Sequence, residues 1–428
     1  MAPPSLALLL LAHPTLALLG GGHMCTTIGY RSPTSSMATH SADCKDCDFR
    51  LSKYPAQEHD LEKEPTRPIY RYHNLYPRMI TEDRGPTWSA SNLEARNQEA
   101  YTDSEYYDKQ ILGYIPQVKE TYGMYESLFG IMNDQQVSIG ESTCAARFGN
   151  EALPRACVGC DGPLFEMTAL SMIALERCAT AKCAVQMMGD LAVEHGFYGA
   201  ENVEDERGEA LTVSDVDEVW MFHISPDPSA TSAVWVAQRV PTGHITAAAN
   251  AFVIRGVQKD HPDFLYSDNL WDIASKEDVL KTVDMYGATD LLDFMATFGP
   301  DEFGPGAPRM KKPEYCTDRV WRVLSLAAPS LNLQRETNFW GDGIPFSVKA
   351  DRDLTVQDIM QMNRDHYEGV EGMDMTQGIA AGPFGNPIRH DEGNQQDNNL
   401  TDWDIHHGEF QRSIGMMRTS WSFVAESR

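Results

Sequence analysis

The region from residue 163 to residue 255 constrains the fold most, because one long helical pattern is followed there by a run of strands. Residues 163–195 give the strongest helix signal, with Pro163 suited to the first turn and Gly196 to the end. Strand patterns follow at 218–224, 232–238 and 244–255. The turn at 240–243 predicts a hairpin between the last two. Paired strands with separate helices predict an α+β layered fold.

Shorter patterns occupy the rest of the chain. Strands are predicted within 25–43 and at 136–139 and 413–424. Helices are predicted at 104–129, where Pro116 kinks or ends the first helix, and at 290–298, 318–327 and 355–367, the last with Thr355 as N-cap. Residues 48–100 and 368–410 show little periodicity, so we expect long loops there.

The charge balance restricts the partners. Asp and Glu number 62 against 35 Lys and Arg, which gives a formal net charge of -27. Because a surface this acidic repels nucleic acid and anionic membranes, we expect neither as a partner. After the first 22 residues, no stretch approaches the length of apolar chain that crosses a bilayer, so no membrane span is predicted.

The first residues differ from the rest. Residues 6–19 are nearly all Leu and Ala, interrupted by His13 and Pro14, and small glycines follow at 20–22. This pattern is typical of a secretory signal peptide, although no Lys or Arg precedes it. We therefore divide the chain into residues 1–24, a signal peptide, propeptide or gene-model extension, and residues 25–428, the folded domain. The expected location is secreted or in a lysosomal or vacuolar lumen, and cytoplasmic if Met24 is the true start.

The chain has nine cysteines. In a secretory compartment they would pair as disulfides, and an odd number leaves one thiol over, which is suspect as a reactive group. Two Cys-x-x-Cys pairs, Cys44/Cys47 and Cys157/Cys160, could instead form a four-thiolate zinc site. The pairs are too far apart in the sequence for a compact zinc module, which favours disulfides or buried thiols.

Cys25 directly follows Met24. Removal of the chain through Met24 would leave Cys25 with a free α-amine, whose pKa near 8 leaves part of it unprotonated at neutral pH. One residue would then supply both nucleophile and base. The alternative is a buried or disulfide-bonded cysteine, and the position of a single cysteine does not decide between the two.

A series of segments in order along the chain resembles the dipeptidases of peptidase family C69. The series begins with Cys25-Thr26-Thr27-Ile28. It comprises residues 25–28, 39–44, 133–143, 189–199, 234–241, 250–255, 319–322 and 374–378. The resemblance implies a four-layer αββα sandwich of the N-terminal-nucleophile type, related to bile-salt hydrolases and penicillin V acylases. It also implies a cysteine-type dipeptidase that cleaves small peptides without a metal or other cofactor.

The resemblance implies roles for particular residues. Cys25 matches the nucleophile, and Asp43 matches a carboxylate that orients its amine and thiol. Asn133 and Asn250 match residues that offer amide donors to an oxyanion. Arg319 matches an arginine near the nucleophile.

Several positions depart from this pattern. Arg322 is close enough to Arg319 to compete for its place in the alignment, and His40 stands where many relatives have arginine. The turn after Cys25 lacks the expected Asp-Gly. Family members continue beyond the position of Arg428, so we expect a sandwich short of C-terminal strands, with 413–424 as an unpaired edge. Two other functions stay open: an acylase or amidase for non-peptide amides, and an inactive, truncated family member with a binding role.

Overall fold

The computed structural model of the 428-residue chain describes residues 24–44, 47, 49–71, 111–149, 152–199, 207–300, 313–335, 344–387 and 410–428. The predicted signal segment up to residue 23 lies outside these ranges, as do residues 72–110 and residues 388–409 of the loop expected at 368–410. Within the described ranges, no helix combines the length and the apolar character needed to cross a membrane.

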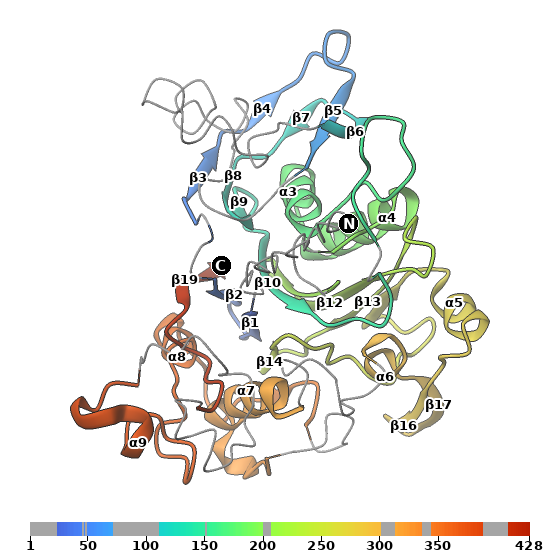
Figure 1. Ribbon diagram of the computed structural model, residues 1–428. Coiled ribbons are helices and arrows are strands. Elements are labelled where there is room, and N and C mark those ends of the chain that lie inside the picture. Colours follow the sequence, from blue (N-terminus) through green and yellow to red (C-terminus); the bar gives the residue numbers. More distant parts are fainter. Residues whose placement is uncertain are drawn as a thin grey trace, which may run out of the picture.

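Two antiparallel sheets form the centre of the molecule (Figure 1). The smaller has five strands in the order β18 (Val348–Lys349), β14 (His244–Ala248), β1 (Met24–Arg31), β2 (Ser36–Asp43) and β19 (Thr419–Ser427). The larger has eight, in the order β15 (Phe264–Tyr266), β13 (Ala233–Arg239), β12 (Val219–Pro226), β11 (Gly208–Ser214), β10 (Ser138–Cys144), β9 (Phe129–Asn133), β8 (Met124–Ser127) and β3 (Ser52–Tyr54).

The two sheets approach closely where β1 and β2 cross β10 to β12. The hydroxyls of Thr27 and Thr212 lie 2.6 Å apart and share a hydrogen bond across the interface. A Cβ atom at Gly140 would overlap the carbonyl of Thr39, so only glycine fits there. The threonine hydroxyls and the absence of a side chain at Gly140 therefore set the distance between the sheets.

Two helices, α3 (Met167–Arg177) and α4 (Ala181–His195), pack on the larger sheet. Their buried side chains share a core with Trp220, Phe222 and Trp235. The single helix predicted for 163–195 is thus two helices. Glu166 caps the first, Thr180 caps the second, and Gly196 ends the pair with φ 83°, at the position expected from the sequence.

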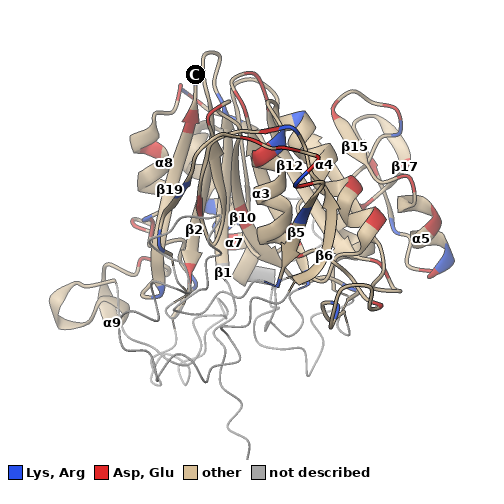
Figure 2. Cartoon of the chain, turned by 90° about the horizontal axis from the view of Figure 1, so that it is seen from above, with Lys and Arg blue, Asp and Glu red and all other residues tan. Residues whose placement is uncertain are grey.

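The smaller sheet is covered by α7 (Pro313–Ala327), whose Val323 and Leu324 pack with Ile28 and Ile245. Next to it, α8 (Val356–Met362) begins with the predicted N-cap Thr355. Figure 2 shows α8 beside β19 on one side of the sheets and α3 with α4 toward the other. Helices on the outer faces of antiparallel sheets confirm the predicted α+β class.

The remaining elements are small and peripheral. They are three two-stranded antiparallel sheets, β4 (Gln57–Glu58) with β7 (Glu120–Thr121), β5 (Thr66–Tyr70) with β6 (Ile111–Pro116), and β16 (Thr282–Met285) with β17 (Ala288–Leu292), and the helices α5 (Leu270–Lys276), α6 (Phe294–Phe298) and α9 (Gly378–Ala381).

Three predictions of secondary structure are wrong. The described part of the helix predicted at 104–129 contains strands instead. Residues 111–116 pair with β5 and bury Leu112 and Ile115, and such pairing overrides helical spacing. The loop expected at 48–100 contains β3, β4 and β5. The helix expected at 290–298 begins only at Phe294, since the preceding residues form β17.

The hairpin predicted around 240–243 is also wrong. The turn itself forms, with the N–H of His244 donating to the carbonyl of Pro241 at 3.0 Å. Its flanking strands then separate, β13 into the larger sheet and β14 into the smaller. The turn therefore connects the sheets, and β14 ends at Ala248 rather than at residue 255.

The last strand forms an edge of the smaller sheet, as predicted, with β2 on one side and no further strand of the described residues on the other. It begins later than the predicted 413–424, at Thr419, and β19 pairs with β2 from Thr419 to Ser427.

The cysteines form three disulfides between close neighbours: Cys44–Cys47, Cys157–Cys160 and Cys178–Cys183. Each Cys-x-x-Cys pair closes on itself, which rules out the shared four-thiolate zinc site in this state. The odd count leaves three thiols rather than one, since Cys25, Cys144 and Cys316 are outside these disulfides and are buried.

Candidate active site

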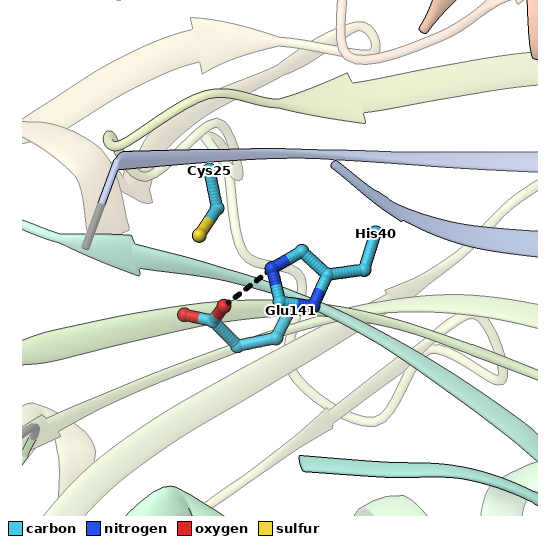
Figure 3. A group of neighbouring side chains, drawn as sticks. All are labelled: Cys25, His40 and Glu141. Carbon is cyan, nitrogen blue, oxygen red and sulfur yellow. Dashed lines mark ion pairs between the residues drawn. The ribbon is translucent and has the colours of Figure 1, made fainter. Parts of the chain in front are cut away.

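Cys25 lies near the start of β1, between β14 and β2, and only 1% of it is exposed. His40 on β2 and Glu141 on β10 approach the same point (Figure 3). One ligand atom from each of the three side chains lies within 4.8 Å of the other two. The His40 Nε2 and Glu141 Oε2 atoms are 3.3 Å apart. Three strands thus bring a thiol, an imidazole and a carboxylate together between the sheets.

The surroundings of Cys25 hold its thiol in the protonated form. Burial raises the pKa of Cys25 well above its ordinary value, and the negative charges of Glu141 and Asp43 raise it further. A hydrogen bond from the backbone of Asp43 opposes this shift only in part. Burial also raises the pKa of Glu141, against a hydrogen bond from Thr143. A reacting Cys25 therefore needs a proton acceptor next to it.

Asp43 is brought to the same end of β1. In the β1–β2 ladder it is the partner of Met24, so it lies beside the residue whose removal would free the amine of Cys25. Its carboxylate is fully buried and accepts hydrogen bonds from Arg412 and from the hydroxyl of Thr419. Burial raises the pKa of Asp43, and the charge of Arg412 counteracts it.

Arg319 holds the main chain of Cys25. Its Nη1 donates to the carbonyl of Cys25 at 2.9 Å and to the hydroxyl of Thr26 at 3.0 Å. Its Nη2 donates to Oδ1 of Asn250 at 2.8 Å. Arg322, the competing position, instead makes a bidentate pair with Asp365 at 2.8 and 2.7 Å. The geometry decides between the two in favour of Arg319.

Asn250 follows β14 in the left-handed region, with φ 61°. Its backbone N–H donates to Oγ of Ser142 at 2.9 Å, and that hydroxyl donates to the carbonyl of Cys25 at 3.1 Å. Its side-chain amide donates to the carbonyl of Thr143 at 2.7 Å. Asn250 is therefore fixed between Arg319, β10 and the main chain of Cys25.

Asn133 is not brought to this site. It lies at the turn between β9 and β10, and its amide donates to the carbonyls of Leu175 and Cys178 at 2.9 and 2.8 Å. Its Oδ1 accepts from the backbone N–H groups of Gln135 and Val137. Because these bonds use both amide hydrogens, the expected role of Asn133 as an oxyanion donor is wrong. It fixes the end of α3 instead.

Sequence reasoning missed three residues of the site. Glu141 and Ser142 belong to a strand whose every residue is buried. Buried polar side chains need partners, so polar residues within a strand pattern are a signal that could have marked them as candidates. Arg412 follows a Gly- and Asn-rich region without periodicity and gives no comparable signal. Its contact with Asp43 joins positions 369 residues apart, and only the fold creates it.

Fold and site together define an α+β protein with a buried, cysteine-centred polar site between two antiparallel sheets. The sequence model described as Peptidase family C69 matches residues 99–428, and the chain therefore belongs to that family. The matched range contains Glu141, Asn250, Arg319 and Arg412. Cys25, with His40 and Asp43, precedes it.

A relative named "Probable dipeptidase", from Latilactobacillus sakei, is 25% identical over 193 residues. The alignment covers 45% of this chain and 34% of that protein. The matched part thus spans about a third of the length of this curated relative.

Proposed function

We propose that the chain is a cysteine-type dipeptidase that hydrolyses small peptides through Cys25, exposed as the first residue after removal of residues 1–24. One observation carries the proposal: Cys25 lies at the start of β1 with Asp43, Arg319 and Asn250 gathered around its main chain. Membership of a peptidase family supports it. The arrangement of helices outside two facing sheets supports an N-terminal-nucleophile sandwich of four layers, αββα, for residues 25–428.

The mechanism begins with proton transfer from the thiol of Cys25 to its own α-amine, which Asp43 orients. The thiolate attacks the peptide carbonyl, and Asn250 stabilises the oxyanion. Collapse of the tetrahedral intermediate breaks the C–N bond, and the leaving amine takes the proton from the ammonium of Cys25. Water then attacks the thioester, the α-amine accepts its proton, and the carboxylate product leaves with the thiol restored.

Arg319 contributes to these reaction steps by positioning other groups rather than by transferring a proton. By binding the carbonyl of Cys25 and the amide oxygen of Asn250 together, it keeps nucleophile and oxyanion donor in one geometry. The high pKa of the buried thiol explains why a base belonging to the same residue is needed.

The substrate and location are also proposals. We propose a small peptide as the substrate, neither nucleic acid nor membrane as a partner, and a secreted protein or one in a lysosomal or vacuolar lumen. The three disulfides support a compartment that permits them.

The test is hydrolysis by the mature chain beginning at Cys25. We expect dipeptides to be cleaved in preference to N-acyl amino acids, and Cys25→Ser to lower kcat by at least about 10³-fold. Cys316→Ser, which removes another buried thiol outside the disulfides, is the matched control and should retain activity. Equal turnover by the Cys25→Ser protein contradicts the nucleophile, and faster cleavage of N-acyl amino acids favours an acylase.

The free amine has its own test. Intact mass should show that active protein begins at Cys25. Full activity in material that still carries Met24 contradicts the role of the α-amine while leaving the thiol in place.

A further inference from the structure

The three side chains that meet at Cys25 are a thiol, an imidazole and a carboxylate, and all three are buried. These are the ligand types that zinc binds in proteins, and three protein ligands with a fourth position open to water form a common site. Each ligand comes from a different strand, so the scaffold holding them is rigid.

The distances suit one ion. Bond lengths to zinc of about 2.0–2.3 Å place neighbouring ligand atoms of a tetrahedral site about 3.4 Å apart. His40 Nε2 and Glu141 Oε2 already lie 3.3 Å apart. With all three ligand atoms within 4.8 Å of one another, the sulfur needs to move by little more than about 1 Å, a side-chain rotation.

The charges also suit a dication. A thiolate and the carboxylate of Glu141 together carry the charge that one Zn²⁺ neutralises, with His40 as a neutral ligand. Two buried arginines of the site are engaged by other groups: Arg412 binds Asp43, and Arg319 binds the carbonyl of Cys25 and the side chain of Asn250. Binding would release the thiol proton to solvent.

We propose that Cys25, His40 and Glu141 form a Zn²⁺-binding site that competes with catalysis by occupying the nucleophile. Inhibition rests on the proposed function, whereas binding does not. A metal-bound sulfur has its lone pair in the metal bond and does not attack a carbonyl, so removal of zinc by a chelator restores the thiol. Any opening that admits a peptide to Cys25 also admits the ion.

The test uses the full chain and the mature chain, freed of metal and titrated with Co²⁺ as a coloured substitute for Zn²⁺. We expect one Co²⁺ per chain, with a thiolate-to-metal charge-transfer band and the visible bands of a tetrahedral site, both lost when Zn²⁺ is added. Cys25→Ser should abolish the charge-transfer band. His40→Gln and the isosteric Glu141→Gln should weaken binding at least tenfold.

His366 supplies a matched control. Its Nδ1 lies 3.3 Å from Oε1 of Glu368, the same separation as in the His40–Glu141 pair, but no cysteine belongs to that pair. His366→Gln should leave the Co²⁺ spectrum and affinity unchanged. If His40→Gln and Glu141→Gln bind Co²⁺ as tightly as the unaltered protein does, the proposed ligand set is wrong.

A second measurement needs no variant. Zn²⁺ should protect Cys25 from alkylation by iodoacetamide, read by peptide mapping, with Cys144 and Cys316 as internal comparisons. Absence of both the charge-transfer band and this protection overturns the zinc site, even in a protein that cleaves dipeptides. Metal binding by an inactive protein would instead overturn the dipeptidase and leave the site standing.

Discussion

Arg319 shows how much a single buried residue decides here. It is fully buried on α7, and its guanidinium donates to the carbonyls of Cys25 and Ala249 and to the side chains of Thr26 and Asn250. The position of Cys25, the proposed nucleophile, therefore depends on a contact between residues 294 positions apart.

Replacement of Arg319 tests this dependence. We expect Arg319→Met to lower kcat/KM for a dipeptide by about 10²–10³-fold, because the oxyanion donor and the nucleophile lose their common anchor. Arg319→Lys should recover little, since a single ammonium cannot reproduce the planar fork. The control is Arg322→Met, which removes the pair with Asp365 and should reduce stability but not the kcat/KM of the folded protein.

His223 gives a pH dependence of stability. It is fully buried, its Nε2 accepts from the N–H of Val253 at 2.9 Å, and burial lowers its pKa from 6.5 to about 3. Between these values the unfolded chain binds a proton that the folded chain excludes, so stability falls as pH falls through this window and the contribution is complete above pH 6.5.

The expected result is a free energy of unfolding that declines from neutral pH toward pH 4, measured by urea denaturation. His223→Gln keeps a hydrogen-bond acceptor for Val253 but does not titrate, so its decline should be shallower. An identical slope in the two proteins would assign the pH dependence to other groups.

Among the secondary-structure elements, helix ends were predicted correctly where neighbouring residues in the sequence are enough to end the helix. Thr355 caps α8 in a capping box with Asp358, and Gly196 ends α4, both at predicted positions. These features depend on neighbouring residues alone. The strands β5 and β6 were missed because each needs the other as a partner. The spacing of apolar residues within one segment does not indicate which other segment pairs with it.

The break between α3 and α4 is a testable feature at this scale. The side chain of Thr180 accepts from the N–H of Cys183 at 3.2 Å and starts α4. We expect Thr180→Ala to lower the free energy of unfolding by about 1 kcal/mol, because a helix-terminal donor loses its partner. Thr180→Ser, which retains the hydroxyl, should be close to neutral, and a loss equal to that of Thr180→Ala would show that the methyl group matters instead.

At the scale of the molecule, the close approach of the sheets positions the site. Cys25 and His40 lie on one sheet and Glu141 on the other, so their meeting depends on the spacing that Gly140 permits. Gly140→Ala would press a Cβ against the carbonyl of Thr39.

We expect Gly140→Ala to cost about 1–3 kcal/mol, the usual penalty of overpacking, and to lower activity as well by separating the strands. Thermal unfolding and dipeptide hydrolysis measure the two effects. Gly159→Ala is the comparison: apart from its chain neighbours, no atom of the described residues lies within 4 Å of a Cβ placed there, so this variant reports only the backbone cost of the positive φ, about 1 kcal/mol. Equal losses in both variants would contradict the role of the sheet spacing.

The α+β class, strands within 25–43 and the helix signals at Thr355 and Gly196 could be predicted from the sequence. The sequence also singled out Cys25, Asp43, Asn250 and Arg319 as candidate site residues. These follow from periodicity, local hydrogen bonding and a recognisable order of motifs. The tertiary structure alone decided that Asn133 belongs to a turn, that β13 and β14 enter different sheets, and that His40, Glu141 and Arg412 join the site. The physical reason is that each of these outcomes depends on which distant strand or helix lies opposite, and that is fixed only when the sheets pack.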